Sequence, residues 1–189
     1  EKKFDAESLR FVYIGRIAYD KGIEYAIKAM KVLEERYAVT NFGFEIAGSG
    51  SDEKRLQAMV DRLSMGDRVK FVGPIFGEEK IAFWRRAHVF VFPTFHAEGL
   101  PYALLESLAS GTPVITTRVG GIPDVVKEND HAVFVESQNT MELAGAIKDL
   151  MDDRFRLKMM SLNGKVRVQN EYSIKKLERE FKRLYENVG

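Results

Sequence analysis

Six short apolar segments alternate along the chain with longer segments of helical periodicity, and this alternation restricts the fold more than any other feature. The short segments are rich in β-branched and aromatic residues and are predicted strands, at 10–15, 42–48, 68–73, 88–94, 113–117 and 131–136. Helices are predicted at 22–37, 51–63, 78–87, 101–110, 140–151, 153–169 and 174–187, with a helical turn at 122–126. Strands and helices that alternate at this spacing indicate right-handed βαβ crossovers. We therefore predict an α/β fold, with a doubly wound, mainly parallel, Rossmann-like sheet.

The chain shows no internal repeat, low-complexity segment or long linker, so we predict one domain over residues 1–189, with an entry segment at 1–9 and a terminal helix at 174–187. Two helix starts can be predicted in detail. Ser51 is the expected N-cap of the second helix, and Pro101 is expected at the first position of the fourth. Trp84, with its neighbours Phe83 and Ile81, is expected in the core.

Composition excludes several classes of function. The 29 basic and 28 acidic residues leave a net charge of +1, so no nucleic-acid partner is predicted. The chain has no cysteine, and no spacing of histidine and acidic residues indicates a metal site. No apolar run approaches the roughly 18 residues of a membrane span. We expect a cytoplasmic protein, with any peripheral contact to the inner face of a membrane made by another part of the full-length protein.

Ligands of doubly wound sheets bind beyond the carboxyl ends of the strands, so the loops there hold the candidate site residues. In "GRIAYDKG", Gly15 ends a strand, and Arg16 and Lys21 provide two cations suited to a diphosphate. Taken alone, these charges are more typical of a solvated surface loop. The "AGSGS" turn around Gly48 leads to a helix N-terminus, where backbone N–H groups could receive an anion. The "RVGGIP" turn at 118–123 allows close approach of a ligand, or is simply a tight turn.

The most informative segment contains two acidic residues, Glu98 and Glu106, eight positions apart. Glu106 is the only charged residue between Gly99 and Thr117, in a stretch otherwise composed for burial. Gly99, Leu100 and Pro101 begin a helix whose free N–H groups attract anions. Glu106 could then accept hydrogen bonds from vicinal hydroxyls, or form a structural ion pair with a lysine or arginine.

The three histidines give weaker signals. His96, two residues before Glu98, is a candidate for a ligand contact. His88 and His131 are more typical of packed or surface residues.

These motifs resemble the carboxyl-terminal, donor-binding domain of the retaining GT-B glycosyltransferases of family four, also called group 1. The resemblance runs from about residue 10 to residue 187 and depends on "GRIAYDKG", "IAGSG", "FVGPI" and the E-x7-E motif, in this order. It implies half of a GT-B fold, a nucleoside-diphosphate sugar as donor substrate, and no cofactor. The amino-terminal, acceptor-binding domain of the same protein would be the missing partner.

The resemblance also implies roles for individual residues. Arg16 and Lys21 would hold the diphosphate and stabilise it as leaving group, with Glu98 against the sugar as the third catalytic residue. The nucleotide-sugar site would further include Gly15, Gly48, Ile75, His96, Gly99, Leu100, Pro101 and Glu106, with Glu106 on the ribose and the main chain near Ile75 on the base. The isolated domain should bind donor nucleotide weakly and transfer little sugar.

Two other functions stay open. One is half of a sugar-nucleotide epimerase of the same architecture, for which His96 is the single acid–base candidate. The other is a nucleotide-binding module without catalytic activity. The base (uridine, guanosine or adenosine), the sugar, the acceptor and the oligomeric state are not readable from these residues.

Overall fold

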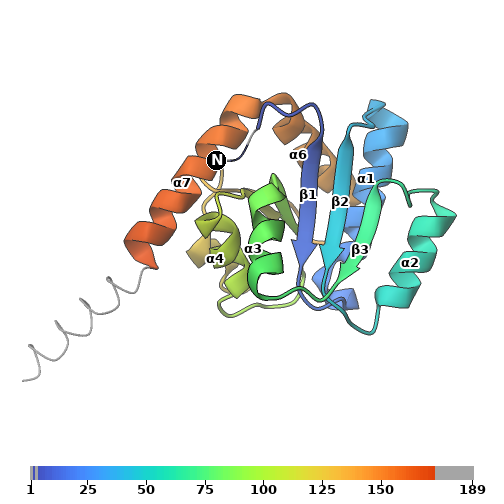
Figure 1. Cartoon of the computed structure of the whole chain (residues 1–189), viewed down its shortest axis with the longest axis horizontal. Helices are drawn as coiled ribbons and strands as arrows, with labels where there is room; N and C mark the ends of the chain where they lie inside the picture. The colour runs from blue at the N-terminus through green and yellow to red at the C-terminus, as the bar shows by residue number, and fades with distance from the viewer. Residues whose placement is uncertain (1, 3, 173–189) are drawn as a thin grey trace, which may run out of the picture.

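The structure, a computed structural model, describes residues 2 and 4–172 and contains one six-stranded sheet with helices on both faces (Figure 1). The strands are β1 (Leu9–Ile14), β2 (Phe42–Ala47), β3 (Val69–Gly73), β4 (Val89–Phe92), β5 (Val114–Thr116) and β6 (Ala132–Phe134). Their order is β3-β2-β1-β4-β5-β6, and every neighbouring pair is parallel. This is the doubly wound order, with its switch point between β1 and β4, and it confirms the predicted fold class.

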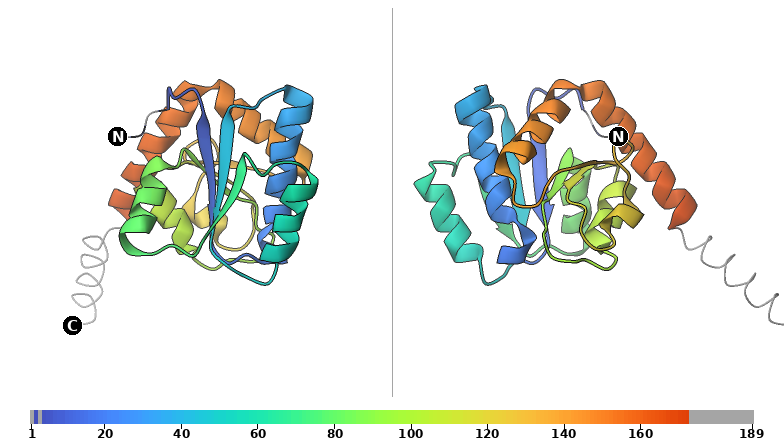
Figure 2. Two further views of the ribbon diagram at one scale, coloured as in Figure 1. Left: turned by 45° about the vertical axis from the view of Figure 1, so that its right-hand side comes forward. Right: turned by 180° about the vertical axis from the view of Figure 1, so that it is seen from behind.

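The helices form two layers, one on each face of the sheet. They are η1 (Tyr19–Lys21), α1 (Ile23–Tyr37), α2 (Glu53–Arg62), α3 (Gly77–Arg86), α4 (Tyr102–Ala109), α5 (Ile122–Val125), α6 (Thr140–Asp152) and α7 (Arg154–Glu171). Figure 2 shows α1 and α2 on one side of the strands, and α3 and α4 on the other. The neighbouring helices α1 and α6 pack together, as do α4 and α7.

The core lies between these layers and contains large side chains from the central strands. Phe11 and Tyr13 of β1, Phe44 of β2 and Phe90 of β4 are fully buried. The apolar stripe of α1 packs into this core, with Ile23, Ala26, Ile27, Met30 and Leu33 buried as the periodicity predicts. A packed core of this kind fixes the strand ends, where the candidate residues lie.

Three local predictions are wrong. The second helix begins at Glu53 after Asp52, and Ser51 does not cap it, because Asp52 takes that position and its carboxylate pairs with Arg55. Pro101 precedes the first turn of α4 instead of opening it, since its extended ψ of 107° lies outside the helical region. Ile81 is 44% exposed, although its neighbours Phe83 and Trp84 are buried as expected. The predicted helix at 174–187 lies outside the described residues.

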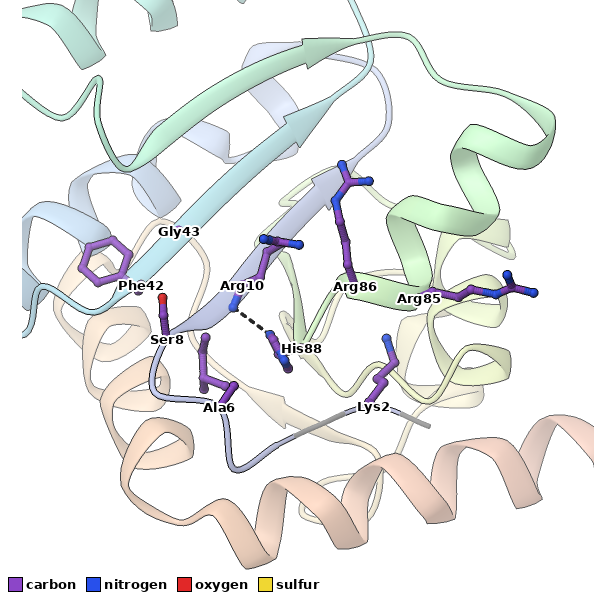
Figure 3. A pocket seen from close by; sticks show the side chains of 10 residues that line it. Lys2, Ala6, Ser8, Arg10, Phe42, Gly43, Arg85, Arg86 and His88 are labelled. Atoms are coloured by element: carbon purple, nitrogen blue, oxygen red, sulfur yellow. Dashed lines mark hydrogen bonds between the residues drawn. The ribbon is translucent and has the colours of Figure 1, made fainter.

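The segment before β1 is held by Lys2, at the amino ends of the strands. The Lys2 amine donates to the carbonyls of Trp84 and Ala87, both at 2.5 Å, where α3 ends. It borders a cavity of about 450 Å³ (Figure 3), lined by Lys2, Ala6, Ser8, Leu9, Arg10, Phe42, Gly43, Arg85, Arg86 and His88. Arg10 and Arg86 both pair with Glu45. Lys2, Arg10 and Arg86 thus have partners within the protein, and we assign these three residues a structural role.

Lys2 makes the stability of the fold depend on pH. Burial, and secondarily the charge of Lys165, lower the pKa of Lys2 from 10.5 to about 7. Between these two pH values the unfolded chain binds a proton that the folded chain releases, so the contribution of Lys2 to the free energy of unfolding rises with pH. Urea unfolding at pH 7 and pH 9.5 should show this rise in the wild type. Lys2→Met should flatten it, whereas Lys54→Met, on the exposed side of α2, should not. Equal pH slopes in all three proteins would contradict the assignment.

Candidate functional site

The two loops at the switch point bring Lys21 and Glu98 together. Lys21 ends η1, just after β1, and Glu98 lies in the loop after β4. The Lys21 amine donates to Glu98 Oε1, and both side chains are largely buried, at 10% and 18% exposed. An ion pair this secluded fixes both groups at the carboxyl edge of the sheet. Two of the three predicted catalytic residues are therefore in direct contact.

Asp20 links the third, Arg16, to His96. Its Oδ2 atom lies 3.2 Å from Arg16 Nη2 and 3.3 Å from His96 Nδ1. Its carbonyl accepts hydrogen bonds from the backbone N–H groups of Phe95 and His96. Asp20 therefore joins the loop after β1 to the loop after β4. Sequence reasoning missed it, although it stands within the "GRIAYDKG" motif.

Tyr13 fixes the backbone of Arg16 through a hydrogen bond. The Tyr13 hydroxyl donates to the Arg16 carbonyl at 2.8 Å. Burial, followed by the nearby charge of Glu98, raises the pKa of this hydroxyl far above its ordinary value, so it stays protonated and remains a donor. The Arg16 guanidinium itself is 61% exposed. The backbone of Arg16 is thus fixed, while its guanidinium is exposed to solvent.

Glycines at this edge allow the loops to contact one another through their backbones. A Cβ on Gly48, whose φ is +127°, would lie 1.8 Å from the Gly15 carbonyl oxygen. Gly121 donates its N–H to the Glu98 carbonyl at 2.7 Å, and a Cβ there would lie 2.1 Å from the Gly99 carbonyl oxygen. The glycines of the "RVGGIP" turn therefore make room for the backbone beside Glu98. For this turn the sequence left open a ligand contact or a tight turn alone. The structure shows a tight turn packed against the backbone of the neighbouring loop.

Glu106, in the second turn of α4, contacts two donors from α3. Its Oε1 atom lies 2.5 Å from Lys80 Nζ, and its Oε2 accepts from Trp84 Nε1 at 3.2 Å. The carboxylate is 35% exposed, so it is not sealed in the core. The structural ion pair that the sequence left open is therefore present. Lys80 and Trp84 were not among the predicted site residues, because one resembles a solvated helix charge and the other a core residue.

Two cavities meet at Lys80. The first, of about 390 Å³, lies beyond β1, β2 and β3 and is lined by Ile14, Gly15, Arg16, Gly48, Ser49, Pro74, Ile75, Phe76 and Lys80. The second, also about 390 Å³, lies between α3 and α4 and is lined by Gly77, Lys80, Ile81, Trp84, Arg85, Glu106, Ala109 and Ser110. The first cavity gathers Gly15, Arg16, Gly48 and Ile75, four of the predicted residues. Glu106 borders the second.

The remaining candidates lie around the start of α4. Gly99 and Leu100 are exposed, and Pro101 is buried against the fold. Among the described residues no acceptor contacts the N–H groups of Tyr102 and Ala103, in the first turn of α4. These groups can therefore bind an anion. No group of three or more histidine and acidic residues that could hold a metal is found in residues 2 and 4–172.

The other two histidines serve the fold. His88 Nδ1 accepts from the N–H of Arg10 at 2.8 Å, at the amino edge of the sheet. His131 is buried, and burial lowers its pKa. Both agree with the packed role expected of them.

Comparison with known proteins identifies the family. The family model described as "Glycosyl transferases group 1" matches residues 1–167. The chain belongs to the group 1 glycosyltransferases. An uncharacterized glycosyltransferase of Methanocaldococcus jannaschii is 30% identical over 92% of the chain and 44% of its own length.

Solved structures agree with this assignment. Sucrose-phosphate synthase from Thermosynechococcus elongatus superposes with a TM-score of 0.84 at 28% identity, over 96% of the chain and 46% of that protein. Anabaena HepE, solved in complex with UDP, superposes with a TM-score of 0.83 at 16% identity, over 96% of the chain and 49% of HepE. These matches confirm the predicted GT-B-type, Rossmann-like fold of a glycosyltransferase.

The group 1 chain spans less than half the length of these relatives. The substrates and activity of a whole enzyme therefore do not follow from membership alone. No helix in the described part of the chain has both the length and the apolar character needed to cross a membrane.

Proposed function

We propose that this group 1 glycosyltransferase chain binds a nucleoside-diphosphate sugar, as the donor-binding half of a retaining glycosyltransferase. The observation that supports this most directly is the Lys21–Glu98 pair at the switch point, beside the cavity that Arg16 and Ile75 line. It places cationic and carboxylate groups at the same strand ends. A nucleoside-diphosphate sugar has an anionic diphosphate and neutral hydroxyl groups, which these two kinds of side chain recognise.

In this proposal the diphosphate binds Arg16, Lys21 and the first turn of α4. Arg16 is exposed and joined to Asp20 by one surface ion pair, which typically stabilises by at most about 1 kcal/mol. It can therefore turn towards phosphate oxygens at little cost. Lys21 is already fixed, and the helix N-terminus adds partial positive charge.

The chemical step needs charge stabilisation on the departing group. The bond between the anomeric carbon and the diphosphate oxygen breaks, and the oxygen leaves with the electron pair. A new bond from the acceptor oxygen forms on the same face of the sugar, which retains the configuration, and the proton of the acceptor hydroxyl passes to the departing diphosphate oxygen. Arg16 and Lys21 would stabilise the charge that develops on the diphosphate, while Glu98 contacts the sugar.

The rest of the donor follows the two cavities. The cavity at Gly15, Gly48 and Ile75 has the apolar character and the volume to accept the base. Glu106 would accept hydrogen bonds from the ribose hydroxyls. UDP is the first nucleotide to test, since HepE, a protein of the same fold, was solved with it.

Calorimetric titration with UDP, GDP and ADP tests the proposal. One nucleotide should bind best, and Glu106→Ala and Arg16→Ala should each weaken it by about tenfold, because each removes a charge-assisted hydrogen bond. Glu35→Ala and Arg62→Ala, at exposed positions on α1 and α2, are matched controls and should bind as the wild type does. Sugar transfer by the isolated chain should be slow. Failure of the folded chain to bind any of the three nucleotides would contradict the proposal.

A further inference from the structure

The carboxylate of Glu106 is held by two donors from one helix. Lys80 and Trp84 are four residues apart on α3, so their side chains project from the same face. Lys80 contacts Oε1 at 2.5 Å and Trp84 contacts Oε2 at 3.2 Å. Each oxygen thus has its own donor, and the plane of the carboxylate is fixed relative to α3.

This arrangement leaves Glu106 able to accept further hydrogen bonds. An ionised carboxylate has about four acceptor positions, two on each oxygen. Lys80 and Trp84 occupy one on each, so one remains free on Oε1 and one on Oε2. Two neighbouring hydroxyl groups, such as the 2′- and 3′-hydroxyls of a ribose, can donate to two such positions at once. The side chain is also 35% exposed, which leaves it accessible.

The two donors contribute differently. Trp84 is 5% exposed, and its ring packs edge-on against Phe90 at 5.2 Å and against Phe83 at 6.1 Å between ring centroids. Its indole N–H is therefore a rigid donor. Lys80 is 34% exposed and supplies a positive charge on a flexible stem. Trp84 fixes the direction of the carboxylate, and Lys80 keeps an ionic partner beside it.

We infer that Lys80 and Trp84 are positioning residues, which hold Glu106 so that it selects ribonucleotides over 2′-deoxyribonucleotides. The inference rests on the proposed donor site and adds to it a role for α3, which supplies the two residues that let the site distinguish ribose from 2′-deoxyribose. The opposite role for Lys80 is that of a competitor, whose ion pair must break before ribose binds. The two roles predict opposite effects when Lys80 is removed.

The test uses the nucleotide that the wild type binds best among UDP, GDP and ADP, together with its 2′-deoxy counterpart. The wild type should prefer the ribonucleotide by about 10-fold, since a hydrogen bond to a charged group is lost with the hydroxyl. Trp84→Phe and Lys80→Met should each weaken ribonucleotide binding by about 3- to 10-fold and change 2′-deoxyribonucleotide binding far less. The ratio of the ribonucleotide affinity to the 2′-deoxyribonucleotide affinity therefore falls. Lys80→Arg should recover most of the ratio, and Glu106→Gln should lose it.

The outcomes separate this inference from the proposed function. Trp84→Phe keeps the ring packing, and thermal unfolding of each variant shows whether the fold is intact. An unchanged ratio in both Trp84→Phe and Lys80→Met would overturn the inference alone. Tighter ribonucleotide binding by Lys80→Met would identify Lys80 as a competitor and also overturn it. A wild type that binds no nucleotide would overturn both the proposed function and the inference.

Discussion

Lys21→Met is expected to weaken binding of a nucleoside diphosphate by about 10- to 100-fold, because it removes a fixed cation from the proposed diphosphate site. The same change should lower the free energy of unfolding by about 2–4 kcal/mol, since Glu98 is then left largely buried without its cation. Calorimetry measures the first effect and urea unfolding the second. Binding of the nucleoside without phosphate should change little.

A double variant separates the two effects of Lys21. Lys21→Met with Glu98→Gln removes the unpaired carboxylate, so it should regain much of the lost stability. It should not regain diphosphate binding, because no cation has been restored. If binding returned together with stability, Lys21 would act only as the partner of Glu98, and its proposed role at the diphosphate would be wrong.

Gly48→Val is expected to destabilise the fold by about 3 kcal/mol or more, through a backbone clash combined with an unfavourable φ. The new Cβ would lie 1.8 Å from the Gly15 carbonyl oxygen, and the φ of +127° is one that L side chains rarely adopt. Nucleotide binding should fail as well, since both glycines line the cavity proposed for the base. Urea unfolding checks stability, and titration with UDP, GDP and ADP checks binding.

The strand that precedes Gly48 provides a control for this substitution. Gly43 lies in β2 and has no heavy atom within 4 Å of the position that a Cβ would take. Valine also has a high strand propensity. Gly43→Val should therefore leave stability nearly unchanged. Equal unfolding midpoints for Gly48→Val and Gly43→Val would show that the close contact between Gly48 and Gly15 is not required for stability.

The fold could be predicted because its signals are local. Each buried strand is a short run of β-branched and aromatic residues, and each helix shows its own apolar stripe, so their alternation alone indicates the doubly wound class. Helix starts were less predictable. Ser51 and Pro101 are both good residues for a helix start, and the structure places each of them one residue earlier, relative to its helix, than expected.

The site was only partly predictable, because its contacts join residues distant in sequence. Lys21 and Glu98 were selected separately, yet their direct contact spans 77 positions and depends on β1 and β4 being neighbours. Glu106 was found through its composition, as a lone charge in an apolar stretch. Its partners Lys80 and Trp84 could not be found in this way. They lie on α3, which must cross the sheet from β3 to β4 before they reach α4. Periodicity within α3 does not indicate that crossing.

The backbone contacts among the glycine loops also limit how this domain can change its specificity. Gly15 fits against Gly48, and Gly121 fits against Gly99, with no side chain between them to absorb a shift. An insertion in one loop would displace its neighbour, so natural or laboratory variation in loop length should be rare here. Adaptation to a new donor would instead proceed by exchange of side chains that project outward, such as Phe76, which is 77% exposed. Libraries for altered donor preference should therefore vary such positions and keep the glycines constant.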